Sequence, residues 1–370
     1  MKFTIPKTEL QDLLQVVVSA VPAKSTLPIL SNLLIEADKE GITLVATDLD
    51  ISIRTRGEAA VSDGGRITVP AKRIGEIVRE LPDAEVKVAL KETRMTLSCG
   101  NGSFTIQGLD AEDFPQLPQV DAEKMATLPV DALEKAVRRT NYAVSGDETR
   151  QMLTGALLQF RGGELRMVGT DGHRLAKAAF KVNVSGLEGR DLIIPPKALA
   201  QAVRLGAGQE KLNLSVSKNF AVFEMGPTTV YSRLIDGNFP NYEQVIPKEN
   251  PKIFTVKREE LVAGLRRVAV LSDSVTRQVK MALKPEYVEL SVSTADVGEG
   301  REKIAVEYRG EPLDIGYNAA YLLDALRTMS SPMVQMALNT PTSPGVITPV
   351  DQEKDEDLVC LIMPLRLPEA

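Results

Sequence analysis

The chain repeats itself three times, and this repeat constrains its fold more than any other feature of the sequence. Three similar segments begin at Phe3, Ala126 and Phe254, which are 123 and 128 residues apart. Each segment joins a short strand-like piece to a helix with apolar residues at i, i+3, i+4 and i+7. A second helix recurs within each repeat. The spacing therefore predicts helices over 6–21, 70–80, 130–144, 195–205, 256–271 and 318–329.

Short stretches that alternate apolar and polar residues lie between the expected helices. They cover 42–48, 86–90, 104–108, 212–216, 221–225 and 229–234. Period-2 patterning bounded by turn residues indicates antiparallel sheet, and a Phe-Pro pair follows the last strand at 114–115 and 239–240. Recurrent helices alone would fit any α+β chain, but here strand-helix order, apolar register and the Phe-Pro pair agree. The sequence therefore predicts an α+β fold of three tandem similar domains, each with two helices and antiparallel sheets, over 1–124, 125–251 and 252–370.

Charge is distributed unevenly along the chain. The whole chain has a formal net charge of −6, yet the six expected helices hold 14 basic and 9 acidic residues. Helices that share one surface would attract phosphates there while the rest of the chain repels them. The alternative is that Lys and Arg are simply good helix formers on solvated faces.

Cysteine and histidine are too scarce for several kinds of site. Cys99 and Cys360 lie far apart and form no CxxC, and His173 is the only histidine. This pattern indicates reduced thiols in the cytoplasm and argues against a transition-metal site. No apolar run approaches the roughly 20 residues that span a bilayer, so we expect no membrane segment.

Five strings of the sequence resemble one known family. They are LPILSNLLIEA, VATDLDISI, VGTDGHRLA, IDGNFPNYEQVIP and the closing IMPLRL. They are similar to the bacterial sliding clamps, the β subunits of DNA polymerase III, and the resemblance covers the whole chain. It implies a dimeric ring whose helices line a hole threaded by double-stranded DNA without sequence specificity. It also implies a processivity factor that is not an enzyme, needs no cofactor, and docks the replicative polymerase, the clamp loader and other proteins on its outer face.

The resemblance assigns roles to three sets of residues. The cleft for partner peptides is expected to comprise Leu153, Thr170, Gly172, His173, Arg174, Leu175, Pro240, Val245, Leu361, Met363, Pro364, Leu365 and Arg366. Edge strands are expected to meet at the dimer interface through Phe104, Val270, Leu271, Glu299 and Glu302. For DNA contact we choose basic residues of the expected inner helices and the loop after the first helix: Lys24, Lys72, Arg73, Lys135, Arg138, Arg139, Lys197, Arg204, Arg266 and Arg267.

The lone histidine could also simply close a hairpin, and two other functions of the whole chain stay open. One is an enzyme that uses Asp171, His173 and Arg174, although GxSxG, HExxH and Gly-Lys-Ser/Thr phosphate-loop motifs are absent from the sequence. The other is a scaffold that binds proteins without threading DNA. Thr-Asp also recurs at 47–48 and 170–171 and, as STAD, at 293–296, which indicates a turn in which the Asp side chain accepts backbone hydrogen bonds.

Two further segments depart from the family pattern or lack regular structure. The chain continues past the family's usual end with Pro368, Glu369 and Ala370. The stretch 340–357 is Pro-rich and then acidic, and is predicted to be a mobile loop with a strand fragment at Val346–Thr348.

Overall fold

Two compact units make up the chain. The computed structural model describes residues 1–118, 125–182, 184, 186–217, 219–295 and 297–367. Unit 1 consists mainly of 1–130 and 197–234, and unit 2 mainly of 131–184, 188–196 and 235–367. The C-terminal extension 368–370 therefore lies outside the described residues.

The described residues form α-helices at all six predicted positions. These are α1 (Lys7–Val18), α2 (Ala71–Glu80), α3 (Val130–Thr140), α4 (Pro196–Gly206), α5 (Arg258–Ala269) and α6 (Ala319–Thr328). The apolar spacing buries one face of each helix: in α1 that face is Leu10, Leu13, Leu14 and Val17. The helix α1 ends three residues earlier than predicted. Ala20 and Val21 instead donate backbone hydrogen bonds three residues back, to Val17 and Val18, and Pro22 keeps the helix from continuing further.

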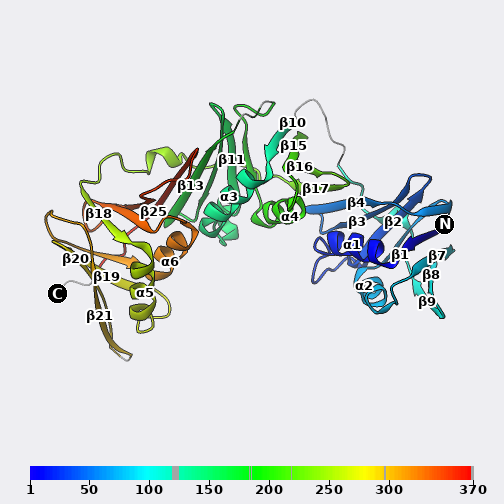
Figure 1. Cartoon of the computed structure of the whole chain (residues 1–370), viewed down its shortest axis with the longest axis horizontal. Helices are drawn as coiled ribbons and strands as arrows, with labels where there is room; N and C mark the ends of the chain where they lie inside the picture. Colours follow the sequence, from blue (N-terminus) through cyan, green and yellow to red (C-terminus); the bar gives the residue numbers. More distant parts are fainter. Residues whose placement is uncertain (119–124, 183, 185, 218, 296, 368–370) are drawn as a thin grey trace. The chain divides into compact units, whose positions relative to one another are not determined.

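Unit 1 contains two antiparallel sheets. The five-stranded sheet has the order β5 (Ala60–Asp63), β1 (Lys2–Pro6), β7 (Glu85–Lys91), β8 (Arg94–Cys99) and β9 (Gly102–Gln107). The eight-stranded sheet has the order β10 (Met125–Pro129), β15 (Lys211–Ser217), β16 (Phe220–Met225), β17 (Thr228–Arg233), β4 (Ile51–Gly57), β3 (Gly41–Thr47), β2 (Asn32–Asp38) and β6 (Gly65–Pro70). The helices α1 and α2 pack against each other (Figure 1).

Unit 2 repeats this plan with an eight-stranded and a four-stranded antiparallel sheet. The larger has the order β14 (Asp191–Ile194), β11 (Ala156–Arg161), β12 (Glu164–Thr170), β13 (Arg174–Lys181), β25 (Glu356–Ile362), β24 (Gly345–Pro349), β23 (Met333–Leu338) and β18 (Lys252–Lys257). The smaller has the order β21 (Gly298–Ala305), β20 (Tyr287–Thr294), β19 (Gln278–Lys284) and β22 (Leu313–Asn318). The helices α5 and α6 lie beside each other (Figure 1).

Each eight-stranded sheet combines strands from two of the predicted repeats. In unit 1, β17 of the second repeat pairs with β4 of the first. In unit 2, β25 of the third repeat pairs with β13 of the second. The sequence repeats three times, but the chain folds into only two compact units. The pairing of strands from different repeats explains this difference.

The chain leaves the last strand of every repeat in the same way. Leu109 donates a backbone hydrogen bond to Thr68, Ile235 to Ile193, and Leu365 to Gly316, at 2.9, 2.9 and 2.8 Å. In the third repeat this bond ties the tail that follows β25 to β22 of the smaller sheet. The repeat therefore extends to the connecting segments, and it fixes where the residues after β25 run.

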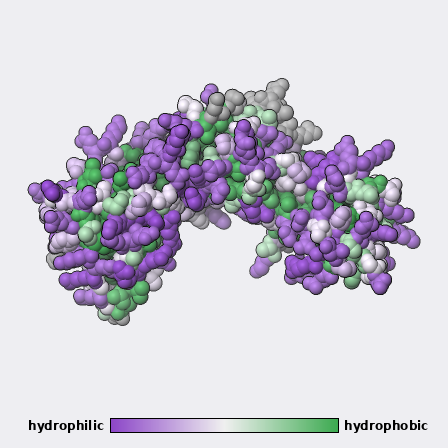
Figure 2. Space-filling view, in the orientation of Figure 1, coloured by the Kyte–Doolittle hydropathy of each residue, from purple (hydrophilic) through white to green (hydrophobic). Residues whose placement is uncertain are grey.

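The surface in view is mostly hydrophilic, with apolar residues in small separate groups (Figure 2). The described part of the chain has no helix long and apolar enough to cross a membrane. Within the same residues, no group of three His, Cys, Asp or Glu side chains is placed to hold a metal ion.

Candidate functional site

The turn between β12 and β13 carries the lone histidine, and one carboxylate organises it. Asp171 Oδ1 accepts hydrogen bonds from the backbone N–H groups of His173 and Arg174 at 2.8 and 3.0 Å. The Thr170 hydroxyl donates to the Arg174 carbonyl at 2.7 Å. Gly172 takes φ +87° at the tip, a conformation that glycine adopts without steric cost. Asp171 is thus occupied by the turn itself.

The same turn recurs in unit 1, as the Thr-Asp repeat predicts. Asp48 Oδ1 accepts from the backbone N–H groups of Asp50 and Ile51 at 3.2 and 2.7 Å. The position of Gly172 is taken there by Leu49, at φ +81°. The turn prediction is confirmed in the first two repeats, while Asp296 of the third lies outside the described residues.

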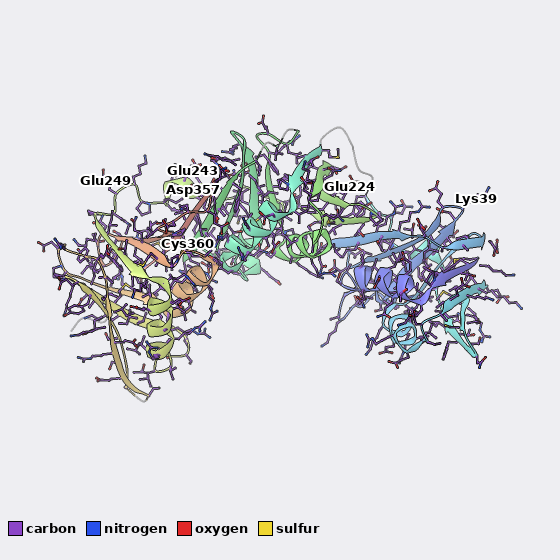
Figure 3. The ribbon with its side chains drawn as sticks, viewed as in Figure 1. Lys39, Glu224, Glu243, Glu249, Asp357 and Cys360 are labelled. Atoms are coloured by element: carbon purple, nitrogen blue, oxygen red, sulfur yellow. The ribbon has the colours of Figure 1, made fainter. Side chains whose placement is uncertain are left out.

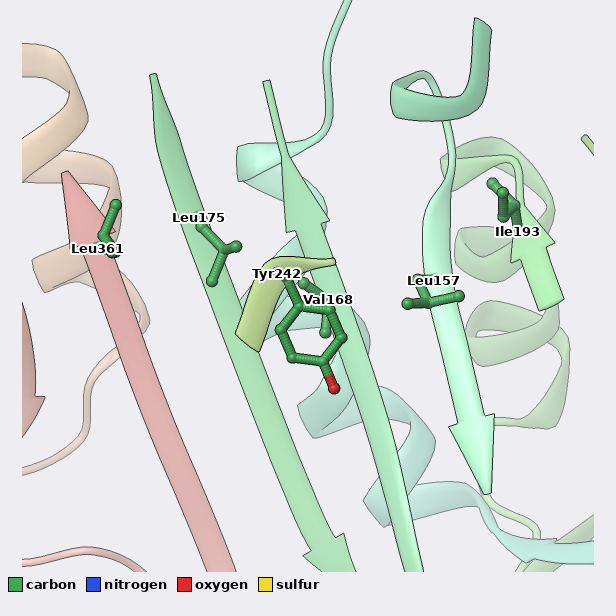
Figure 4. Close-up of a cluster of buried hydrophobic side chains, with 6 residues drawn as sticks. All are labelled: Leu157, Val168, Leu175, Ile193, Tyr242 and Leu361. Atoms are coloured by element: carbon green, nitrogen blue, oxygen red, sulfur yellow. The ribbon is translucent and has the colours of Figure 1, made fainter. Parts of the chain in front are cut away.

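An apolar floor lies beside this turn. Leu175 of β13 pairs with Leu361 of β25, and both belong to a buried cluster whose other members are Leu157, Val168, Ile193 and Tyr242 (Figure 4). The Tyr242 ring comes from the short helix η5 (Tyr242–Gln244), and its hydroxyl donates to Gln159 Oε1 at 2.8 Å. The polar end of the ring is satisfied by this hydrogen bond and by one from Arg166, while its body packs in the apolar cluster.

Two exposed apolar residues directly follow elements that contribute to the floor. Val245, directly after η5, is 52% exposed, and Met363, directly after β25, is 37% exposed. Met363 donates its backbone N–H to the His173 carbonyl at 2.8 Å, so the turn and the tail are joined. Glu243 projects from the surface near here, whereas Cys360 lies inside unit 2 (Figure 3).

Most residues predicted for the cleft come together in this region. The turn residues Thr170 to Leu175, together with Leu361 and Met363, are linked by the contacts above. Pro240 lies between Phe239 and Tyr242, which both pack on the floor. Leu365 and Arg366 instead follow the tail: Leu365 bonds Gly316, and the Arg366 carbonyl accepts from Gln278 at 2.9 Å. We call the turn, the floor, the η5 segment and the tail to Arg366 the docking site, after the role that the sequence resemblance implies for it.

Sequence reasoning missed several residues of this site. Met152, Ile235, Phe239 and Ile246 pack against the floor, and Leu153, which was predicted, is buried next to Met152. Their apolar character is visible in the sequence, and the Phe-Pro repeat could have pointed to Phe239. The sequence does not indicate a role for Gln159 in the site, because its hydrogen-bond partner Tyr242 is 83 residues away.

Arg174 points away from solvent and is held by two carboxylates. Its side chain is 14% exposed, and its guanidinium lies 3.0 Å from Asp171 Oδ2 and 2.7 Å from Asp324 Oδ2. The guanidinium carbon also lies 4.4 Å from the centre of the Tyr321 ring. Burial lowers the pKa of Arg174, but the hydrogen bond to Asp324 and the charge of Asp171 more than offset this, so the net shift is upward.

Cys360 is enclosed behind the floor. The Tyr142 hydroxyl donates to its Sγ at 3.2 Å. Burial raises the pKa of Cys360 to about 11, so the thiol stays protonated near neutral pH.

The basic residues predicted for DNA contact differ in exposure. Lys24, Arg138 and Arg266 are exposed, and the side chains of Lys72 and Arg73 are 86% and 73% exposed. These five side chains are accessible to phosphates. They lie on or just beyond α1, α2, α3 and α5.

The structure removes Arg139 from the set of residues predicted for DNA contact. Its side chain is 2% exposed; Nε lies 2.9 Å from Glu356 Oε1, and Nη2 lies 3.1 Å from Glu353 Oε1. A side chain enclosed in this way cannot reach a phosphate, so the prediction of DNA contact at Arg139 is wrong. Lys135 bonds Glu353 at 3.0 Å and is 30% exposed. The acidic part of 340–357, predicted to be a mobile loop, is thus anchored to α3.

Five other predicted DNA residues have partners within the chain. Lys72 and Arg73 lie 4.0 and 3.2 Å from Glu76 on the same helix. Lys197 bonds Asp48 at 2.6 Å, Arg204 donates to Ser19 at 2.9 Å, and Arg267 pairs with Glu302. The side chains of Lys197 and Arg267 remain 50% and 62% exposed.

Three of the five residues predicted for the dimer interface lie on edge strands, and the other two follow helix α5. Phe104 is 42% exposed on β9, the last strand of its sheet. Val270, directly after α5, is 76% exposed, and Leu271 beside it is partly buried. Glu299 and Glu302 lie on β21, the edge strand of the four-stranded sheet.

Repeated strand-helix halves, eight-stranded sheets shared between repeats, and six helices define a three-domain clamp fold. Models of the DNA polymerase III beta subunit match the chain over its N-terminal domain at 1–118, its central domain at 127–241 and its C-terminal domain at 243–366.

Named relatives and solved structures agree with these models. The beta sliding clamp of Synechococcus elongatus is 36% identical over 99% of this chain and 100% of its own length. That of Caulobacter vibrioides is 37% identical over the same shares. A crystal structure of the DNA polymerase sliding clamp from Pseudomonas aeruginosa superposes with a TM-score of 0.94 at 30% identity, covering 99% of this chain and 100% of that one. The chain belongs to the DNA polymerase III beta subunit family, the bacterial sliding clamps, and its function is that of a processivity factor.

Proposed function

We propose that two copies of the chain close into a ring. Each copy offers two edge strands, β9 and β21, with exposed apolar side chains on or near them, such as Phe104 and Val270. An edge strand presents unpaired backbone groups to another chain, and head-to-tail contacts form a ring when the rotation closes. Because Arg267 already pairs with Glu302 inside the chain, strand pairing and apolar packing are the main contacts.

The ring encircles duplex DNA and slides on it. The exposed basic residues Lys24, Lys72, Arg73, Arg138 and Arg266 support contact with phosphates. Phosphate contacts carry no sequence information and weaken with salt. A modest number of them attracts the duplex without fixing a register, so retention comes from closure of the ring. Domain boundaries near 124 and 251 would give the ring six similar modules.

The docking site binds short peptide segments of the replicative polymerase, the clamp loader and other proteins. An apolar floor with a few polar groups at its margin suits apolar anchors and one or two orienting polar contacts. A Pseudomonas aeruginosa clamp has been crystallised with griselimycin bound, and we propose that the docking site of this chain accepts the same ligand. Met363 offers an adaptable wall for partners of different shape.

We infer that the chain is not an enzyme and acts without a cofactor in the cytoplasm. Asp171 is committed to the turn, and Arg174 is paired with Asp171 and Asp324. Neither is free to serve His173 in acid-base chemistry, which needs a partner within hydrogen-bond reach.

The match to all three clamp domains along the whole chain carries the proposal. Its test is topological: the chain is loaded onto nicked circular DNA by a bacterial clamp loader, and the circle is then cut once. A threaded ring slides off the ends, so the protein should separate from the DNA after cutting and stay on uncut circles. Retention on the cut DNA would refute threading and favour a scaffold held by contacts.

A further inference from the structure

A hollow lies between α1 and α2 in unit 1, where these two helices pack against each other (Figure 1). Its volume is about 620 Å³, within the range of roughly 300–1,000 Å³ that is usual for ligand sites. We propose that this α1–α2 hollow seats the sugar-phosphate backbone of one DNA strand. The inference rests on the proposed threading of DNA, because it says where on the chain the duplex makes contact. One wall includes Gln11, Gln15 and Val18 of α1, and the other includes Lys72, Gly75 and Arg79 of α2.

A glycine in the middle of α2 keeps the hollow open. Glycine inside a helix is less stable than alanine, so Gly75 needs a reason. Packing within the chain supplies none, because a Cβ added at Gly75 would meet no atom within 4 Å. In α5, by contrast, a Cβ added at Gly264 would lie 2.8 Å from Ile304 Cδ1. The space beside Gly75 is therefore available to a ligand.

The charged groups around the hollow favour a ligand with negative charge. The guanidinium of Arg79 is exposed and has no hydrogen-bond or ion-pair partner among the described residues. Lys24 directly follows a lining residue, and its exposed ammonium is likewise unpaired within the described part of the chain. The acidic lining residue Glu76 is already paired with Lys72 and Arg73, at 4.0 and 3.2 Å. The unpaired charge at the hollow is therefore positive.

The remaining lining residues fit the sugars and phosphates of a DNA strand. Val18 is 41% exposed, and it lines the hollow together with Val21 and Pro22. Their carbon surfaces can pack against deoxyribose, while the side-chain amides of Gln11 and Gln15 can donate to phosphate oxygens. Contacts of this kind carry no sequence information, so a strand seated in the hollow can still slide.

Gly75→Leu tests this seat without changing any charge. Leucine fills the hollow and favours a helix over glycine, so the urea midpoint should equal or exceed that of the wild type. A strand kept out of the hollow loses its contact with Arg79. The salt slope of duplex binding, measured by the anisotropy of a short fluorescent duplex, should therefore become shallower by roughly 0.9. A fourfold rise in salt would then weaken binding roughly 3.5-fold less than in the wild type.

A second variant and a control complete the design. Arg79→Gln leaves the hollow open and removes the unpaired cation, so its salt slope should change by the same roughly 0.9. The double variant should show no further change, because both substitutions remove one contact and residues that share a partner are not additive. Gly146→Leu adds the same side chain at an exposed glycine of unit 2 with open space around it, and should leave the slope unchanged.

Three outcomes would overturn the seat. They are a wild-type slope in folded Gly75→Leu, additive changes in the double variant, and an unchanged slope in Arg79→Gln, which decides the matter even where Gly75→Leu does not fold. Gly75→Leu that binds duplex normally but binds the clamp loader more weakly would assign the hollow to a protein instead. Threading is judged separately: release of the wild-type chain from a cut circle together with unchanged slopes refutes only the seat, whereas retention refutes threading itself.

Discussion

Replacing Arg139 by methionine tests whether this arginine serves stability or DNA. Methionine keeps an apolar stem of similar length and removes the guanidinium. Glu356, which is 2% exposed, then stays in the interior without its cation. Glu353 is 33% exposed, and it can regain water and keep its bond to Lys135.

The magnitude follows from this difference in burial. Removing one partner of a buried ion pair typically costs about 3–5 kcal/mol. Because only Glu356 is left fully enclosed, we expect the lower part of this range, about 3–4 kcal/mol. With a urea dependence of about 2–3 kcal/mol per M, the unfolding midpoint should fall by roughly 1–2 M.

The assay is urea denaturation combined with hydrogen exchange. Exchange in peptides from α3 and β25 assigns the shifted transition to unit 2, because a chain of several domains need not unfold in one step. The double variant Arg139→Met with Glu356→Gln should recover more than half of the loss, since it removes the stranded charge as well.

DNA binding distinguishes the two roles that an arginine of α3 could have, stabilising the fold or contacting phosphates. Arg138, the exposed neighbour on the same helix, is the matched control. Arg138→Ala should lower the salt dependence of DNA binding by about one phosphate contact, a slope change of roughly 0.9, with little loss of stability. Arg139→Met with an unchanged urea midpoint and a lower salt slope would refute the burial argument.

Three other substitutions or treatments have defined outcomes. Gly172→Ala should destabilise the chain by about 1–2 kcal/mol, because φ is +87° and the added Cβ would lie 2.9 Å from the Arg150 guanidinium. The control Gly146→Ala, with open space around the added Cβ, should not destabilise the chain. Equal urea midpoints for the two variants would contradict this prediction. The hydrogen bond from Lys135 lowers the pKa of Glu353. The ionised Glu353 carboxylate therefore contributes its full stability above the pKa of Glu353 in the unfolded chain, about 4.3. This contribution is lost as the pH falls through the lower pKa of Glu353 in the folded chain. Glu353→Gln should thus reduce urea midpoints near neutral pH and converge with wild type in acid, whereas a pH-independent gap would argue against the pair. Burial raises the pKa of Cys360 to about 11, so iodoacetamide at pH 8 should alkylate it at least about 100-fold more slowly in the native chain than in urea, and comparable rates by mass spectrometry would exclude the burial argument.

Local patterns were enough to predict the helices and the turns. The apolar spacing in Leu10, Leu13, Leu14 and Val17 predicts one buried face whatever that face packs against, and α1 follows it. Asp171 organises its turn through backbone groups two and three residues away, so a four-residue string contains all the information. The residues predicted for the docking site came from the resemblance to a known family, not from the physics of the strings.

Contacts between distant segments decided the rest. Arg138 and Arg139 are adjacent arginines on one helix, yet one is exposed and the other is buried against Glu353 and Glu356, 214 and 217 residues from Arg139. Asp324 likewise reaches Arg174 across 150 residues. The sequence by itself determined which faces are apolar and where the backbone turns, because those depend on neighbours along the chain. Only the tertiary structure decided which charges are buried and paired, because that depends on which strands of different repeats meet.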